Sequence, residues 1–196
     1  MDNHSLESLQ SIIKFGGNSE DANGTLNLFL PKFNATIEIQ LNLLHSNTLL
    51  PRSVKTINDI VNLSDVAYHQ LLQLLYDDAL RTRDEVAFVD AGNSQQAPSS
   101  FIARLFGRKK PAPEVMLAPD DPRHPCYLEN GINSLEQNVE WLGFRIDEHV
   151  NVHGRLCVLD CLPRWEEEHG ITIVIRDGKP VATGPYDLAF EAFDLM

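Results

Sequence analysis

The N-terminal part of the chain alternates between apolar and polar positions in two short runs. Residues 35–41 alternate strictly, so that every second side chain is aliphatic and those between them are polar or small. A period of two with one polar face is typical of an antiparallel strand that covers a core on one side only. An apolar run at 25–30 is bounded by a glycine and a proline. The intervening residues 31–34 therefore predict a hairpin.

Two helical patterns follow the predicted hairpin. Ser53 is a suitable N-cap for a short helix that ends near Val61, and Ser64 for a longer helix at 65–83. Apolar residues recur three and four positions apart in both segments, and Val66 belongs to this stripe in the longer one. An aspartate at the start and two arginines at the end of the longer segment match the helix dipole. We expect both helices to bury one face.

The C-terminal part is rich in strand patterns. Alternation at 143–152 and at 155–159 predicts two strands, and the β-branched run 171–175 predicts a third. Asp177 and Gly178 are typical of a type I′ hairpin, after which a final strand follows. We expect four antiparallel strands here. No alternation of strands with helices favours a parallel sheet.

These patterns predict a single α+β domain over residues 1–196, with an antiparallel β-sheet and two helices packed on one of its faces. Residues 91–100 are polar and lack periodicity, so we expect a loop there. Five prolines and a basic run predict that about 107–125 forms a flexible connector.

The charge of the chain narrows the classes of partner. The chain has 196 residues, 43% of them hydrophobic, and a formal net charge of −12. Residues 118–196 hold 15 acidic and 6 basic side chains, so this part carries most of the excess. A strongly acidic chain repels phosphate backbones and anionic lipids, so we expect neither nucleic acid nor a membrane as a partner. No glycine-rich phosphate-binding motif occurs, and we expect no cofactor.

The three cysteines help to predict the cellular compartment of the protein. They are Cys126, Cys157 and Cys161. Their number is odd, and the polar, acidic N-terminus lacks the basic and apolar regions of a secretion signal. We therefore expect a cytoplasmic protein whose thiols are free. No apolar stretch approaches the roughly 18 residues that a membrane-spanning helix needs.

Histidines and cysteines recur at multiples of four residues in the C-terminal part. The residues concerned are His149, His153, Cys157, Cys161 and His169. In a strand, residues four apart are separated by roughly 13 Å, at about 3.3 Å per residue. One zinc ion with ligands at about 2.0–2.3 Å cannot bridge that distance. We therefore predict no metal site and no catalytic residue. A small metal-dependent or thiol hydrolase that uses His149, His153, Cys157 and His169 remains the alternative.

The most distinctive stretch runs from Trp165 to Gly170 and reads Trp-Glu-Glu-Glu-His-Gly. We interpret it as a tight acidic connection between two core strands. Trp165 is expected to bury its ring while its indole N–H finds an acceptor. Gly170 permits the turn before the next strand, and His169 is expected to contact a neighbouring carboxylate. Trp165, His169, Gly170 and Gly178 are thus predicted to be structural.

This turn, the β-branched strand after it and the Asp-Gly hairpin resemble an uncharacterised family of small bacterial domains. Its members often sit beside polymorphic toxins and are regarded as candidate immunity proteins. The resemblance covers about residues 140–187. The sequence departs from the pattern in two consecutive acids, Glu167 and Glu168, and the insertion near 107–125 has no counterpart. The resemblance implies a cytoplasmic immunity protein that binds and neutralises a cognate toxin by direct occlusion, and not an enzyme.

The acidity of the C-terminal part fits such a role if the toxin is basic. An acidic surface attracts a basic partner and speeds the encounter. We predict that six carboxylates contribute to the toxin-facing side: Asp147, Glu148, Glu166, Glu167, Glu168 and Asp177. Acidity that serves only solubility, and an adaptor whose partner is not a toxin, remain open as alternatives. The basic segment Arg108–Lys110 is the next place to look for an interface.

Overall fold

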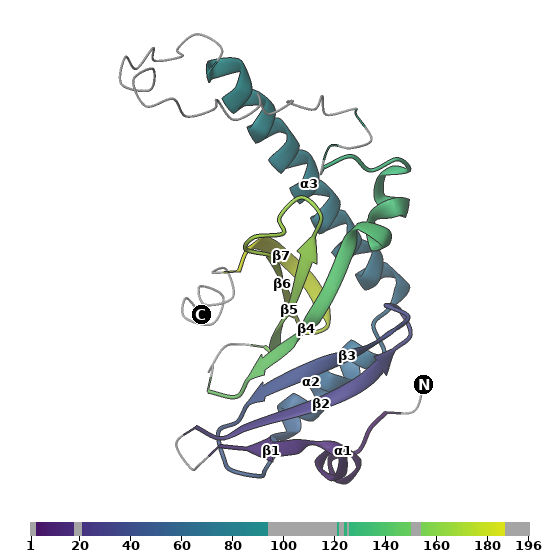
Figure 1. Cartoon of the computed structure of the whole chain (residues 1–196). Coiled ribbons are helices and arrows are strands. Elements are labelled where there is room, and N and C mark those ends of the chain that lie inside the picture. The colour runs from purple at the N-terminus through teal and green to yellow at the C-terminus, as the bar shows by residue number, and fades with distance from the viewer. Residues whose placement is uncertain are drawn as a thin grey trace, which may run out of the picture.

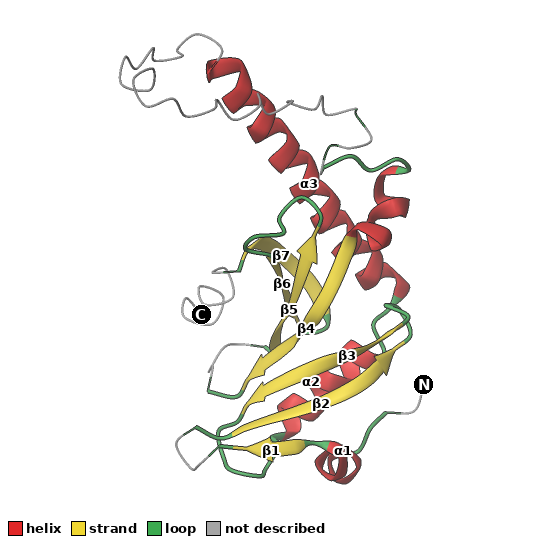
Figure 2. Ribbon diagram, in the orientation of Figure 1, coloured by secondary structure: helices red, strands yellow, loops and turns green. Residues whose placement is uncertain are grey.

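Seven strands form one open sheet, in the order in which they occur along the chain (Figure 1 and Figure 2). The computed structural model describes residues 3–17, 21–93, 121, 124, 126–149 and 154–186. The strands are β1 (Lys14–Gly16), β2 (Asn23–Leu30), β3 (Ala35–Asn42), β4 (Val139–Asp147), β5 (Leu156–Pro163), β6 (Ile171–Arg176) and β7 (Lys179–Pro185). The helices are α1 (Leu6–Ile12), α2 (Pro51–Val61), α3 (Asp65–Asn93) and the 3₁₀ helix η2 (Gly131–Asn138).

Neighbouring strands run antiparallel, except for β3 and β4. These two pair in parallel, from Ile39 opposite Phe144 to Asn42 opposite Asp147. The connection between them carries α2, α3 and η2. The predicted α+β fold is confirmed, but the expectation that no strands pair in parallel was wrong. A single long crossover leaves no regular alternation of strands and helices in the sequence, so no pattern predicted it.

Both long helices lie on the same face of the sheet, as predicted (Figure 2). α2 lies behind β2 and β3 in this view, and α3 passes beside β7. The core fills the space between helices and sheet. Its fully buried side chains include Ile39, Ile57, Leu71, Leu75, Phe144 and Leu159.

Helix α2 begins earlier than predicted. Pro51 is at the first helical position, where a backbone N–H has no intrahelical partner in any case, and Leu50 is the N-cap. Ser53 was predicted to cap this helix, but it lies inside the first turn and is buried. Its hydroxyl donates to Glu148 Oε1 at 2.5 Å. The prediction that Ser53 caps α2 failed because a proline at the first helical position marks the start of a helix equally well.

Helix α3 is longer than predicted. Ser64 caps it as expected, and its hydroxyl oxygen accepts from a backbone N–H of the first turn at 3.1 Å. The helix continues past the predicted end at residue 83 and projects beyond the sheet (Figure 1). Residues 91–93 of the predicted loop are therefore helical, whereas 94–100 lie outside the described residues. Val66 is 69% exposed, so it does not belong to the buried stripe.

The strand boundaries of the C-terminal part differ from the predicted ones. β4 begins earlier than predicted and ends at Asp147, and residues 150–152 of the predicted strand lie outside the described part. β5 continues to Pro163, beyond the predicted strand 155–159. The four antiparallel strands themselves are confirmed.

Both predicted hairpins are present. Leu30 lies opposite Ala35 at the end of the β2–β3 ladder. Asp177 and Gly178 have φ angles of 49° and 74°. Two successive residues with positive φ are what a type I′ turn requires.

Most of the predicted connector at 107–125 lies outside the described residues, and so does the basic segment Arg108–Lys110. Both remain predictions from the sequence. Within the described part, none of the helices is long and apolar enough to cross a membrane.

Candidate functional site

The β5–β6 connection lies against helix α3 and is held there by Trp165. The side chain is only 7% exposed, and its Nε1–H donates to Asp78 Oδ2 at 3.0 Å. Asp78 belongs to α3, is itself buried and also pairs with Arg81. The predicted burial of Trp165 and the predicted partner for its indole are confirmed. Because a buried carboxylate needs donors, this contact fixes the turn on the helix.

The backbone of the turn depends on Gly170. Its φ is +70°, and a Cβ at this position would approach the carbonyl oxygen of Cys161 to 3.0 Å. A residue with a side chain would therefore be strained here. His169 Nδ1 lies 3.2 Å from Glu166 Oε1, which is the predicted contact with a carboxylate. Trp165, His169 and Gly170 thus organise the turn that presents the acidic residues.

Exposed carboxylates gather at this end of the sheet. Glu167 and Glu168 are exposed at the tip of the turn. Glu140, at the start of β4, is also exposed, and it lies opposite Leu162 near the end of β5. None of the described residues forms a hydrogen bond or an ion pair with the carboxylates of Glu140, Glu167 or Glu168. Their charges are therefore free to act on other molecules.

The remaining predicted carboxylates lie at the opposite end of the strands. Asp147 ends β4 and Asp177 begins the β6–β7 turn, whereas the acidic turn follows the end of β5. β5 spans Leu156 to Pro163, so roughly 25 Å separates the two groups at about 3.3 Å per residue. The expectation that these acids form one surface was wrong. In an antiparallel sheet, consecutive turns lie at opposite ends.

Glu148 is not a surface residue. It is 1% exposed, and its carboxylate accepts from Leu50 N at 2.8 Å, Leu44 N at 3.2 Å and Ser53 Oγ at 2.5 Å. Leu50 is the N-cap of α2. A carboxylate at that position stabilises the start of a helix. The prediction that Glu148 faces a toxin was therefore wrong, because this side chain joins the end of β4 to α2.

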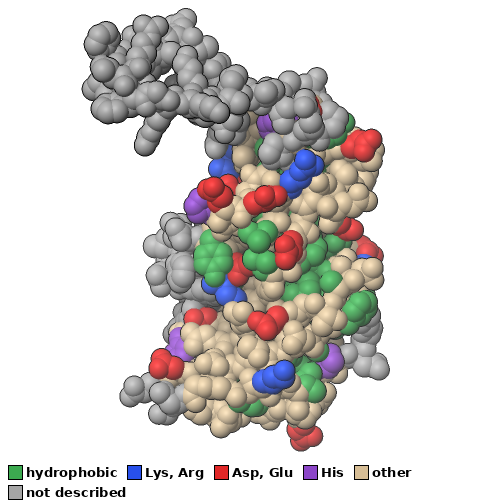
Figure 3. Space-filling view, viewed as in Figure 1, with side chains coloured by type: hydrophobic (Ala, Val, Ile, Leu, Met, Phe, Trp, Pro, Cys, Tyr) green, Lys and Arg blue, Asp and Glu red, His purple; other side chains and the backbone are tan. Residues whose placement is uncertain are grey.

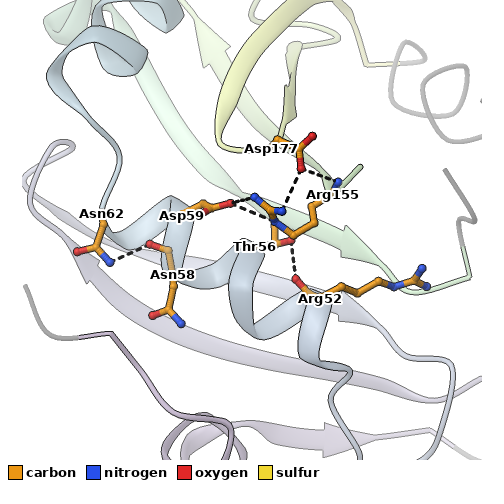
Figure 4. Close-up of polar contacts among 7 residues, drawn as sticks. All are labelled: Arg52, Thr56, Asn58, Asp59, Asn62, Arg155 and Asp177. Atoms are coloured by element: carbon orange, nitrogen blue, oxygen red, sulfur yellow. Dashed lines mark hydrogen bonds and ion pairs between the residues drawn. The ribbon is translucent and has the colours of Figure 1, made fainter. Parts of the chain in front are cut away.

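Asp177 also has an internal partner (Figure 4). Arg155 lies between Asp177 and Asp59 of α2. Its Nη2 is 2.6 Å from Asp59 Oδ2, and its Nη1 is 3.1 Å from Asp177 Oδ1. This cluster ties the β6–β7 hairpin to α2. No local pattern in the sequence predicts this contact, because Asp59 and Arg155 are 96 positions apart.

A cleft of about 640 Å³ lies beside this cluster, between α2, the start of α3 and the β6–β7 turn. Its lining includes Lys55 and Lys179 together with amide and aliphatic side chains. Asn58 of α2 already pairs with the backbone N–H and C=O of His4, at 2.7 and 2.9 Å. Polar side chains of the lining thus bind the N-terminal segment. Among the described residues, the lining does not place a nucleophilic side chain in contact with a base.

The histidines and cysteines of the hydrolase alternative are not brought together among the described residues. Cys157 and Cys161 lie in the core on β5. His149 follows the end of β4, whereas His169 lies beyond the opposite end of β5. His153 lies outside the described part. In that part, no group of three potential ligands is placed to hold a metal ion.

Burial also makes the thiols poor nucleophiles. Loss of contact with water raises the pKa of Cys157 to about 12 and the pKa of Cys126 to about 11, and it raises the pKa of Cys161 as well. The thiolate is the reactive form of cysteine, so all three groups stay protonated near neutral pH. The prediction that the three thiols are free is confirmed.

The face of the sheet opposite the helices carries a partly buried ion pair, which was not predicted from the sequence. Arg145 of β4 donates from Nε and Nη2 to the two carboxylate oxygens of Asp160 on β5, at 2.6 and 2.9 Å. Thr172 Oγ1 donates to the same carboxylate at 2.6 Å, and the guanidinium lies over the ring of Tyr186. The two-pronged geometry locks β4 to β5. Arg145 and Asp160 are charged residues within apolar strands, and their positions in the alternation were the sequence signal that could have revealed the pair.

Figure 3 views the sheet from this open side. Apolar side chains gather near the middle of the view, acidic groups are spread around them, and basic groups are fewer. Phe29 on β2 is 57% exposed and Leu142 on β4 is 44% exposed. The sheet thus presents both apolar and acidic side chains on the side opposite α2 and α3.

Comparison with known protein families concerns the C-terminal part of the chain. Residues 119–190 match the model of a family described as a domain of unknown function (DUF6985). This range includes η2, strands β4 to β7 and the acidic turn. No curated protein and no solved structure matches the chain. The family description assigns no function.

Proposed function

We propose that this protein works by binding another protein, and that it neutralises a toxin with a basic surface by direct occlusion in the cytoplasm. The observation that carries this proposal is the group of exposed carboxylates at one end of the sheet. Glu140, Glu167 and Glu168 have no partner among the described residues. Carboxylates that serve no internal contact are available for an external one.

The electrostatics of the whole chain support the same proposal. A net charge of −12 attracts a basic protein before contact is made. At physiological ionic strength this attraction extends over about 8 Å, and it raises the rate of association more than the final affinity. A fast encounter is an advantage for an inhibitor that has to bind a toxin before the toxin reaches its target.

A hydrolase is the weaker proposal. Its nucleophile would be a thiol that stays protonated near neutral pH, since burial raises the pKa of Cys157. The two described histidines of that alternative lie at opposite ends of β5. We expect purified protein to contain no stoichiometric zinc. One zinc ion per chain, measured by elemental analysis, would favour the hydrolase instead.

The proposal is tested by co-expression with the toxic domain of an effector encoded next to this chain. We expect the chain to restore growth of cells that express the toxic domain, and to form a stable complex with it after purification. A toxic domain from an unrelated effector serves as the control and should not be neutralised. A chain that neither restores growth nor binds the neighbouring toxic domain would contradict the proposal.

A further inference from the structure

We propose that the basic partner docks on the open side of the sheet, at the end that holds the β2–β3 hairpin and the start of β4. This inference rests on the proposed function and names the surface that performs it. The surface consists of Phe29, Glu38, Glu140 and Leu142, which we term the open patch. It combines exposed apolar groups with carboxylates on a face that α2 and α3 do not cover (Figure 2).

The first half of the open patch follows from the pairing of β2 and β3. Leu28 and Ile37 are opposite each other and are buried against the helices. Side chains alternate along a strand, so the neighbouring Phe29 and Glu38 face the other way. Phe29 lies opposite Thr36 next to the hairpin, and more than half of its surface is exposed.

Strand β4 brings the second half to the same end of the sheet, because β4 runs parallel to β3. Trp141 lies opposite Cys161, whose side chain is in the core, so the preceding Glu140 faces the open side. A bulge follows Trp141, and Leu142 at this bulge is exposed. Leu142 follows Trp141 directly, so the alternation places it on the open side, and the bulge then returns Phe144 to the core.

The charge of this side of β2, β3 and β4 is acidic. Arg145 is the only basic residue that the alternation of these three strands places on the open side, and its guanidinium is held by Asp160. Glu38 accepts a hydrogen bond from Gln40 at 2.9 Å, which leaves its negative charge in place. Figure 3 shows acidic groups around the apolar side chains of this view.

This distribution favours a basic partner over a second copy of the chain. A symmetric dimer through the open patch would place the same surface against itself. Glu38 and Glu140 would then approach like charges, which opposes association. A partner with basic residues around an apolar pocket complements the patch, because its cations meet the carboxylates while the pocket receives an exposed ring.

The test measures binding of the purified neighbouring toxic domain to variants of the full chain by surface plasmon resonance. Phe29→Thr combined with Leu142→Thr removes the apolar centre and keeps residues that favour strands. We expect Kd to rise about tenfold or more, mainly through faster dissociation. Glu38→Gln combined with Glu140→Gln should instead slow association and reduce its dependence on salt.

Val66→Ala is the matched control, because it removes an exposed apolar side chain from the start of α3. It should bind like the wild type, and the melting temperature of each variant reports whether the fold is retained. If the threonine variant is poorly folded, the glutamine variant carries the test, since it changes charge alone.

Three outcomes would contradict the proposals, and each of them contradicts a different part. A wild-type chain that does not bind the toxic domain contradicts the proposed function itself. A wild type that binds, with folded open-patch variants that bind within twofold of it at the same rates, leaves the function standing and removes the open patch as the interface. Self-association of the wild type that the threonine variant abolishes would assign the patch to a second copy of the chain.

Discussion

The indole ring of Trp165 connects the β5–β6 turn to helix α3, both by packing and through its bond to Asp78. Trp165→Ala removes both contacts. Truncation of a buried aromatic side chain costs about 3–5 kcal/mol, a large part of the roughly 5–15 kcal/mol that stabilises a whole domain. We therefore expect a large decrease in the free energy of unfolding, measured by urea denaturation.

Trp165→Phe helps to separate the two contributions, because it keeps an aromatic ring in the core while it loses the bond to Asp78 and a smaller part of the packing. Its decrease in unfolding free energy should be smaller, about 1–3 kcal/mol, which is the cost of a buried acceptor that loses its donor. A Trp165→Ala variant with unchanged stability and lost partner binding would show that the ring belongs to an interface and not to the core.

The buried thiol of Cys157 makes stability depend on pH in the alkaline range. Its pKa is raised from 9.0 to about 12 in the folded chain. As the pH rises, the unfolded chain therefore loses this proton first, and stability that is fully present below about pH 9 decreases between about pH 9 and 12. The free energy of unfolding of Cys157→Ala should decrease less steeply over this range. Equal slopes for variant and wild type would contradict a buried, protonated thiol.

At the scale of elements, Glu148 joins the end of β4 to the start of α2. Glu148→Ala leaves the N–H groups of Leu44 and Leu50 without their carboxylate acceptor. The buried Ser53 hydroxyl loses its acceptor as well. A buried donor without a partner costs about 1–3 kcal/mol and the two N–H groups are partly buried, so we expect a total loss of about 2–4 kcal/mol in urea denaturation. Glu168→Ala, at an exposed position, should stay within about 0.5 kcal/mol of the wild type. Similar losses in both variants would contradict this assignment.

Elements that depend on neighbouring residues were predictable from the sequence. The alternation at 35–41, the Ser64 cap and the Asp177-Gly178 hairpin each involve residues close together in the chain, and all three are confirmed. The burial of Glu148 depends instead on a contact with Ser53, 95 positions away. No local pattern encodes such a contact, so an acidic residue at a strand end was interpreted as exposed.

The candidate site was predictable only in part, for a related reason. Glu167 and Glu168 are exposed as expected, because Trp165 and Gly170 build the turn beneath them. The exposure of Phe29 was not predicted. An apolar side chain in a strand is buried or exposed according to the face that the helices cover, and the sequence pattern alone does not reveal that face.

At the scale of the whole molecule, the packed core and the surfaces proposed for binding lie in different places on the sheet. The helices and the core occupy one side of the sheet, whereas the open patch lies on the other and the acidic turn beyond the end of β5. Glu140 links the two surfaces, since it belongs to the patch and lies opposite Leu162, close to the turn. A partner seated on the open patch therefore has the acidic turn at its rim.

Reversing the charge of the acidic turn tests this arrangement. Glu167→Lys combined with Glu168→Lys places two positive charges at the rim, where charges act mainly on the rate of association and on its dependence on salt. We expect slower association with the toxic domain and a weaker effect of ionic strength, with little change in dissociation. The free energy of unfolding should stay within about 0.5 kcal/mol of the wild type, because both side chains are exposed.

Glu7→Lys on α1 controls for net charge alone, since α1 lies at the β1 edge of the sheet, away from the β5–β6 turn (Figure 1). If steering came only from the total charge, this single change would slow association about as much per unit of charge as the double change does. A larger effect per charge at the acidic turn places the turn at the interface. Association of the double variant that is as fast and as salt-sensitive as that of the wild type would exclude the turn, and Arg108–Lys110 would be the next segment to vary.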